Sequence, residues 1–91
     1  MRKITERACR ALEHGYDFYE SNTRVKDGKM YLWDNLIAYI EDGETYVTLA
    51  GYNTVTTRER LNGLTGVSIC SKNFTPYLNG KEISSYGVYK V

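Results

Sequence analysis

The chain has little of what a multi-domain protein needs. It has 91 residues, a single proline (Pro76), two cysteines and one histidine. Splitting so short a chain would leave two pieces too small to bury a useful core, and no linker, repeat or low-complexity run marks a boundary. We therefore expect one compact domain over residues 1–91.

Long apolar runs are missing as well. None approaches the ~20 residues of a membrane-spanning helix, and the N-terminus lacks the hydrophobic core of a secretory signal. The two cysteines, Cys9 and Cys70, fit neither a disulfide framework nor a clustered metal site. These absences predict a soluble protein with reduced thiols in a cytosol, without a membrane partner.

An excess of charge of either sign is also absent, since 12 basic residues face 11 acidic ones. This balance disfavours an acidic DNA mimic, and any electrostatic binding must use a local patch. Tyrosine, in contrast, is abundant, with nine copies. Tyrosine combines apolar area with a hydrogen-bonding tip, which suits half-exposed sheet faces and binding surfaces alike.

Signatures of catalysis are not found in the sequence. No base or nucleophile partner for His14 can be identified from spacing, and there is no glycine-rich phosphate loop or metal-ligand pattern. Glu41, Asp42 and Glu44 cluster at a predicted turn, where solvation explains them. We therefore predict no enzyme, no cofactor and no metal site.

Residues 3–14 predict an amphipathic helix that ends at Gly15. Its apolar side carries Ile4, Ala8, Ala11 and Leu12. Beside them runs a basic stripe of Lys3, Arg7, Arg10 and His14. Two interpretations of the stripe are open. It is a solvent-exposed flank in which Arg10 pairs with Glu6 and Glu13. Alternatively, Lys3, Arg7 and Arg10 contact phosphates.

The rest of the chain reads mainly as antiparallel strands. Asp27-Gly28, Asp42-Gly43 and Asn79-Gly80 each predict a two-residue hairpin turn. The run "MYLWDNLIAYI" predicts one long strand in which residues 33–35 form a bulge that is structural or aims a side chain at a ligand. Pro76 predicts an edge or irregular strand, and residues 86–91 a short final strand.

These elements predict an α+β fold: an antiparallel sheet of about five strands, the N-terminal helix packed on one face, and a short second helix between strands. The expected buried positions are Ile4, Ala8, Leu12, Leu36, Ile40, Leu49, Leu61 and Ile69.

The second helix lies in "TVTTRERLNGL". Thr56 and Glu59 have the spacing of a capping box, so the helix should begin near Thr57. Arg58 and Asn62 would share an outer face, and Arg60 would lie well round from Arg58.

Three interpretations of this helix remain open. Outward Arg and Asn side chains can read base edges, or they can dock on a protein groove. Alternatively, Arg58 and Arg60 pair with Glu59 or with carboxylates of neighbouring strands, and Asn62 helps to cap the helix. The candidate partner-binding residues are Arg58, Arg60, Asn62, Tyr52, Asn53 and Trp33.

Part of the chain resembles a group of short, mostly uncharacterised proteins of tailed bacteriophages. The resemblance rests on "LWDNLIAYIEDGETYVT", "LAGYNTVTTRERLNGL" and "GVSICSKNFTPYLNGKEI", which contain an Asn before Ile-Ala, a Gly-aromatic turn, a Thr-Thr-Arg-x-Arg-Leu-Asn segment and a Tyr-Leu-Asn-Gly-Lys hairpin. It covers roughly residues 30–83, and Tyr52 stands where that group has Trp. The resemblance implies a phage origin and no particular activity.

Together these features favour a non-catalytic phage protein in the bacterial cytoplasm that inhibits or redirects a host or defence complex, such as a CRISPR effector. Its partner would be a bacterial protein or ribonucleoprotein. The alternatives are a small nucleic-acid-binding module and a virion or assembly component. An exposed edge strand near Pro76 would also allow a homodimer.

Overall fold

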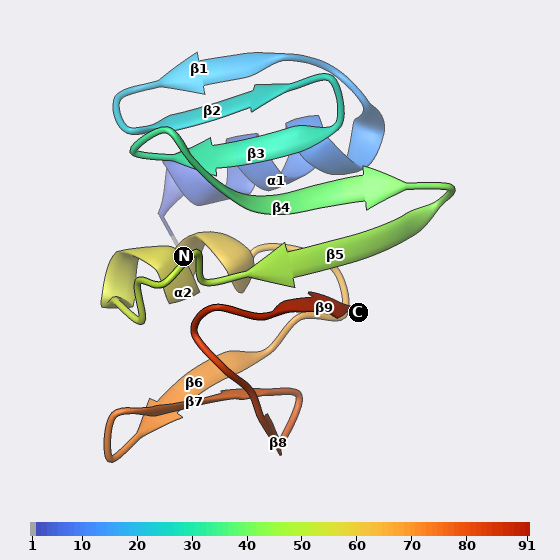
Figure 1. The fold of residues 1–91 in the computed structure, drawn as a ribbon. Helices are drawn as coiled ribbons and strands as arrows, with labels where there is room; N and C mark the ends of the chain where they lie inside the picture. Colours follow the sequence, from blue (N-terminus) through green and yellow to red (C-terminus); the bar gives the residue numbers. More distant parts are fainter. Residues whose placement is uncertain (1) are drawn as a thin grey trace.

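The computed structural model describes residues 2–91 and shows an α+β fold (Figure 1). The two helices are α1 (Lys3–His14) and α2 (Val55–Leu61). The strands before α2 are β1 (Phe18–Glu20), β2 (Thr23–Lys26), β3 (Lys29–Leu32), β4 (Asn35–Glu41) and β5 (Glu44–Thr48). Those after it are β6 (Ile69–Lys72), β7 (Thr75–Leu78), β8 (Lys81–Glu82) and β9 (Val88–Lys90). The predicted fold class is confirmed.

The strands form two antiparallel sheets where the sequence predicted one. Six strands pair in the order β1-β2-β3-β4-β5-β9, and β6-β7-β8 form a separate small sheet. The final strand predicted near the C-terminus is β9, which pairs with β5 at the edge of the large sheet. The short strand β1, which pairs with β2, was not predicted.

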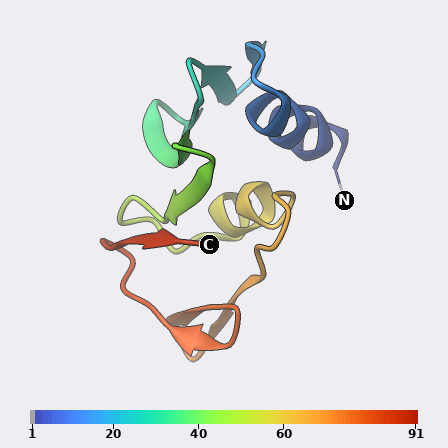
Figure 2. The same ribbon diagram turned by 90° about the vertical axis from the view of Figure 1, so that its right-hand side faces the viewer.

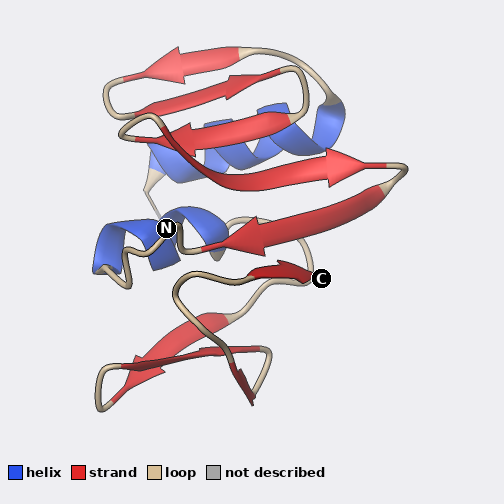
Figure 3. Cartoon of the chain, in the orientation of Figure 1, coloured by secondary structure: helices blue, strands red, loops and turns tan. Residues whose placement is uncertain are grey.

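Both helices lie on the same side of the six-stranded sheet (Figure 2). The colouring by secondary structure shows α1 behind β3 and β4, α2 to the left of the end of β5, and the small sheet at the bottom of the view (Figure 3). We call the helix side the covered face. Within residues 2–91 no helix or strand packs over the opposite side, which we call the open face.

The helix predicted over residues 3–14 is confirmed as α1. It ends as expected at Gly15, which adopts φ 79° and donates its N–H to the carbonyl of Ala11 at 2.9 Å. The buried side is wider than the apolar stripe, because α1 packs against both the sheet and α2 and so also buries Thr5 and Cys9.

The three predicted hairpin turns are present, with positive φ at both central residues of each, as a type I′ turn requires. The long predicted strand over residues 30–40 is wrong. Trp33 and Asp34 both have positive φ, 52° and 64°, and form a tight turn between β3 and β4. A register shift does occur, but between Met30 and Tyr31.

Pro76 does not lie in an edge strand. It lies in β7, the middle strand of the small sheet. The sheet tolerates it because the β7–β8 ladder pairs only Tyr77 and Leu78 with Glu82 and Lys81. Pro76 therefore lies just outside the paired residues of this ladder, where the N–H that proline lacks is not required. Its carbonyl accepts a hydrogen bond from Ile83 N at 3.0 Å.

The core lies between the covered face and the two helices. Five expected positions are buried: Ala8, Leu12, Leu49, Leu61 and Ile69. Ile4, Leu36 and Ile40 are only partly buried. Leu36 was placed wrongly because the register shift pairs it with Tyr31 and buries Ile37 instead. No helix within residues 2–91 has the length and apolar character needed to cross a membrane.

Candidate functional site

Helix α2 begins earlier than the sequence predicted. Its N-cap is Thr54, whose hydroxyl accepts a hydrogen bond from Thr57 N at 3.2 Å, and Thr56 lies inside the helix. The predicted capping box of Thr56 and Glu59 is therefore wrong. The Glu59 carboxylate instead accepts hydrogen bonds from Thr5 and Arg60.

Arg60 is a structural residue at the centre of the molecule. Its side chain is only 1% exposed, and its guanidinium donates to Thr23 Oγ1 at 2.9 Å, to Thr5 Oγ1 at 2.8 Å and to Glu59. These bonds join α2 to α1 and to β2. The predicted pairing with Glu59 is confirmed, and Arg60 cannot present its charge to a partner.

Cys9 lies against the same network. Its Sγ donates to the backbone carbonyl of Arg60 at 3.1 Å. Burial, helped by the carboxylates of Glu13 and Glu59, raises the pKa of the Cys9 thiol to about 12, although Arg60 opposes the shift. The thiol is therefore protonated at neutral pH and is a poor nucleophile. Both Cys9 and the exposed Cys70 are free cysteines.

Arg58, Asn53 and Asn62 also hold the fold together. Arg58 Nη1 donates to the backbone carbonyl of Asn53 at 3.1 Å and to the Asn53 side chain. Asn53 Nδ2 donates to Ser71 Oγ at 3.1 Å in the small sheet. Asn62 bonds both backbone groups of Ile69, at 2.6 and 2.9 Å. These three candidates tie α2 to the β6–β7 hairpin.

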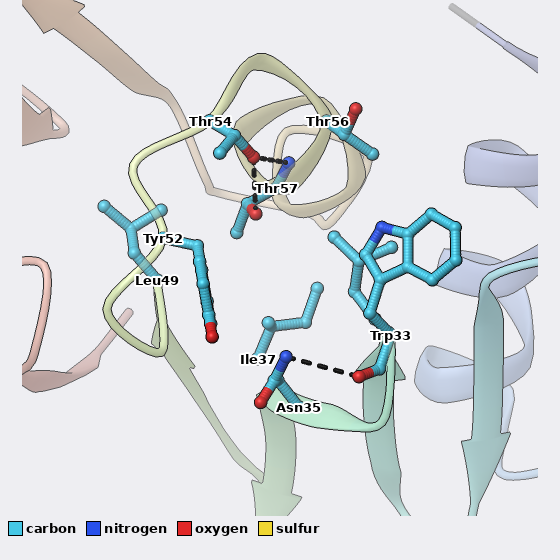
Figure 4. A pocket seen from close by; sticks show the side chains of 9 residues that line it. Trp33, Asn35, Ile37, Leu49, Tyr52, Thr54, Thr56 and Thr57 are labelled. Carbon is cyan, nitrogen blue, oxygen red and sulfur yellow. Dashed lines mark hydrogen bonds between the residues drawn. The ribbon is translucent and has the colours of Figure 1, made fainter.

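The other two candidates, Trp33 and Tyr52, stand at opposite sides of a hollow of about 500 Å³ (Figure 4). The Trp33 side chain projects from the β3–β4 turn and Tyr52 from the loop after β5. The hollow is lined by Leu32, Trp33, Asn35, Ile37, Leu49, Tyr52, Thr54, Thr56 and Thr57. Its aliphatic surface comes from Leu32 of β3, Ile37 of β4 and Leu49 just after β5, and threonine hydroxyl groups come from the start of α2.

Backbone of positive φ lies at Trp33 and directly before Tyr52. Trp33 has a positive φ, which is unusual for a bulky residue, and Asn35 Nδ2 bonds its carbonyl at 3.3 Å. Tyr52 follows Gly51, whose φ is 85°. A Cβ on Gly51 would lie 2.9 Å from Cε1 of Tyr86, so this turn admits only glycine without rearrangement.

Exposure separates these two residues from the rest of the candidate set. Trp33 is 69% exposed and Tyr52 is 55% exposed, although each carries a large apolar ring. The hollow between them thus combines exposed aromatic area with a shape that can receive a side chain.

Comparison with known protein families identifies the family of this chain. The family model of the Kyanoviridae Gp96 protein matches residues 1–89. The chain belongs to the Kyanoviridae Gp96 family. This is a phage protein family, so the phage origin expected from residues 30–83 is confirmed, and the match also includes α1 and nearly all of the tail. No curated protein and no solved structure matches the chain.

In this Gp96 family member the predicted basic stripe lies on the exposed side of α1. Lys3, Arg7, Arg10 and His14 are all exposed. The ion pair found there joins Arg7 to Glu20 of β1 at 3.2 Å, while Glu13, expected beside Arg10, accepts a hydrogen bond from Thr65 N at 2.9 Å.

The open face carries polar and aromatic residues that the sequence analysis did not single out. They include Arg24, Lys29, Tyr31, Tyr39, Tyr46 and Lys90. The sequence signal that could have identified them is their alternation along the strands with the buried Val25, Met30 and Val47. Residues 2–91 contain no group of three or more His, Cys, Asp or Glu side chains that could hold a metal ion.

Proposed function

We propose that this chain is a non-catalytic binding protein with which a phage inhibits or redirects a bacterial host or defence complex in the host cytoplasm. Its contact is with protein, and a CRISPR effector is one complex of the expected kind. Membership of a phage protein family supports the origin. The hollow between Trp33 and Tyr52 supports the binding role.

The single observation that carries this proposal is the exposed aromatic pair beside an apolar hollow. Trp and Tyr are, with Arg, the residues enriched among those that dominate protein–protein affinity, and such residues cluster in well-packed pockets. Leu32, Ile37 and Leu49 provide the apolar lining. The expected occupant is an apolar side chain of the partner protein, desolvated between the two rings.

The strain at Trp33 supports the same role. A positive φ at a tryptophan costs on the order of 1–3 kcal/mol, and such residues cluster at functional sites. At the β3–β4 turn this strain holds the Trp33 ring in solvent, where it contributes little to the core.

The test is quantitative capture from bacterial cells that express the tagged protein, with nuclease treatment before recovery. Wild type is compared with a Trp33→Ala/Tyr52→Ala variant and with Tyr16→Ala. Tyr16 is a matched control, because it is 48% exposed and follows α1, away from the hollow.

We expect a protein that wild type and Tyr16→Ala recover and that the double variant loses. With that protein purified, the double variant should raise Kd by about 30-fold or more. Equal recovery by all three forms would refute the hollow as the contact site. Recovery of virion structural proteins alone would favour the assembly role.

A further inference from the structure

Two rows of tyrosines and cations cross the open face. Residues opposite one another in neighbouring strands point to the same side of a sheet, so the pairing register defines each row. The first row crosses β2, β3, β4, β5 and β9: Lys26, Lys29, Tyr39, Tyr46 and Lys90. The second crosses β1 to β4: Tyr19, Arg24, Tyr31 and Leu36.

Aromatic rings stack on each other in the first row, and a positive charge lies over an aromatic ring in the second. Tyr39 and Tyr46 stack with ring centroids 4.9 Å apart and an interplanar angle of 14°. In the same row Lys29 lies opposite Tyr39 and Lys90 opposite Tyr46, so the register places one lysine beside each end of the stacked pair. In the second row the Arg24 guanidinium carbon lies 4.7 Å from the centre of the Tyr31 ring.

This pattern matches the chemistry of an unpaired nucleic acid strand. Bases stack on aromatic rings, and the phosphates between them need cations a few ångströms away. A base that stacks on the free side of Tyr39 or Tyr46 would lie beside Lys29 or Lys90, and the ammonium of that lysine would then meet the neighbouring phosphate. Paired bases in a duplex cannot stack in this way.

We propose that the open face binds single-stranded nucleic acid, with Tyr39 and Tyr46 stacking on bases and Lys29, Lys90 and Arg24 contacting phosphates. This surface differs from the hollow and from the α1 stripe. It does not use Arg58 or Arg60, whose side chains bond within the fold.

Carboxylates mark the ends of the proposed site. At one end, Glu41 and Glu44 lie opposite each other at the tip of the β4–β5 hairpin. At the other end, just before β4, Oδ1 of Asp34 lies 4.0 Å from Nη2 of Arg24. Because these carboxylates repel phosphate, the site is short, with room for ~2–3 stacked bases. A short site with few phosphate contacts predicts moderate affinity that falls with salt.

The test is fluorescence anisotropy of a labelled 12-residue oligothymidine, measured across a range of salt concentrations. The variant Lys29→Gln/Lys90→Gln removes two charges from the open face. Lys72→Gln/Lys81→Gln removes two charges from exposed positions of the small sheet and is the matched control. A third variant, Lys3→Gln/Arg10→Gln, tests the α1 stripe.

We expect wild type to bind the single strand more tightly than a duplex of the same sequence. Lys29→Gln/Lys90→Gln should weaken binding and make the slope of log affinity against log salt less steep by about 1.4, since each single-strand phosphate contact contributes ~0.7. Tyr39→Leu/Tyr46→Leu should weaken binding by about tenfold or more through lost stacking. The two control pairs should bind as wild type does.

Several results would overturn the proposal. These are absence of binding by wild type, an equal loss in the small-sheet control, or a loss confined to the α1 variant. Loss of the captured protein partner in the Lys29/Lys90 variant, without an effect on oligothymidine, would instead assign this face to protein contact. The capture experiment on Trp33 and Tyr52 succeeds or fails independently of these results.

Discussion

The two faces of the six-stranded sheet use arginine in opposite ways. On the covered face Arg60 is enclosed, and its guanidinium bonds only to groups of the same chain. On the open face Arg24 lies over the Tyr31 ring and remains in solvent. In a chain with nearly balanced charge, burial decides which cation serves the fold and which is available to a partner.

The largest effect should come from Arg60→Met. The substitution leaves Thr5, Thr23 and Glu59 without their shared partner, and breaking a buried charge pair in this way typically costs ~3–5 kcal/mol. Urea unfolding measures the loss. Arg24→Met on the open face is the comparison and should cost less than ~1 kcal/mol. Similar losses for both would break the distinction between the faces.

Leu12→Ala should destabilise the protein by roughly 2–5 kcal/mol, because Leu12 is buried where α1 packs on the sheet. Thermal or urea unfolding measures the change. Ile4→Ala, at the partly buried start of the same helix, should cost clearly less. A loss below ~0.5 kcal/mol for Leu12→Ala would show that α1 does not pack as described.

The two thiols should differ in reactivity. Cys70 is exposed and should react with a thiol reagent at pH 8 within the mixing time, whereas Cys9 should react only as the protein unfolds. Because folding raises the Cys9 pKa from 9.0 to about 12, the unfolded chain loses this proton first as pH rises. The stability linked to Cys9 is therefore complete below about pH 9 and falls towards pH 12.

Cys9→Ala supplies the control for that pH dependence. The variant should remove the part of the decline in stability at alkaline pH that is linked to the Cys9 thiol. Rapid labelling of Cys9 in the folded protein would contradict the covered position of its thiol.

The smallest effect on stability should come from the open face. Tyr46→Leu removes the stacking partner of Tyr39 and should cost ~0.5–1.5 kcal/mol, the usual contribution of an aromatic pair. Calorimetry of Tyr46→Leu, Tyr39→Leu and the double variant isolates the coupling between the rings. A coupling near zero would mean that the stack is not maintained in solution.

Local patterns in the sequence were sufficient for α1, for the three hairpin turns at Gly28, Gly43 and Gly80, and for the fold class. They failed at the Trp33-Asp34 turn, because residues 30–40 form a strand-like run without a glycine and only the tertiary fold stabilises positive φ there. Periodicity also placed Arg60 away from Arg58 without revealing that Thr5 and Thr23, far away in sequence, would enclose it.

The candidate site was predictable only in part. Trp33 and Tyr52 were named separately, and nothing in their spacing shows that they flank one hollow. The rows of the open face depend on strand register. Register places Lys29 opposite Tyr39 in the β3–β4 pair, Tyr39 opposite Tyr46 in the β4–β5 pair, and Tyr46 opposite Lys90 in the β5–β9 pair. Register follows from the complete sheet and could not be derived from any single strand.

The most direct test of the contrast between the faces is an NMR titration of the wild-type protein with oligothymidine, following the tyrosine ring signals and the backbone amides. The account predicts upfield shifts of the Tyr39 and Tyr46 ring protons as bases stack, with the α1 amides of Lys3, Arg7 and Arg10 unchanged. Unmoved ring signals, or shifts that begin on α1, would contradict it.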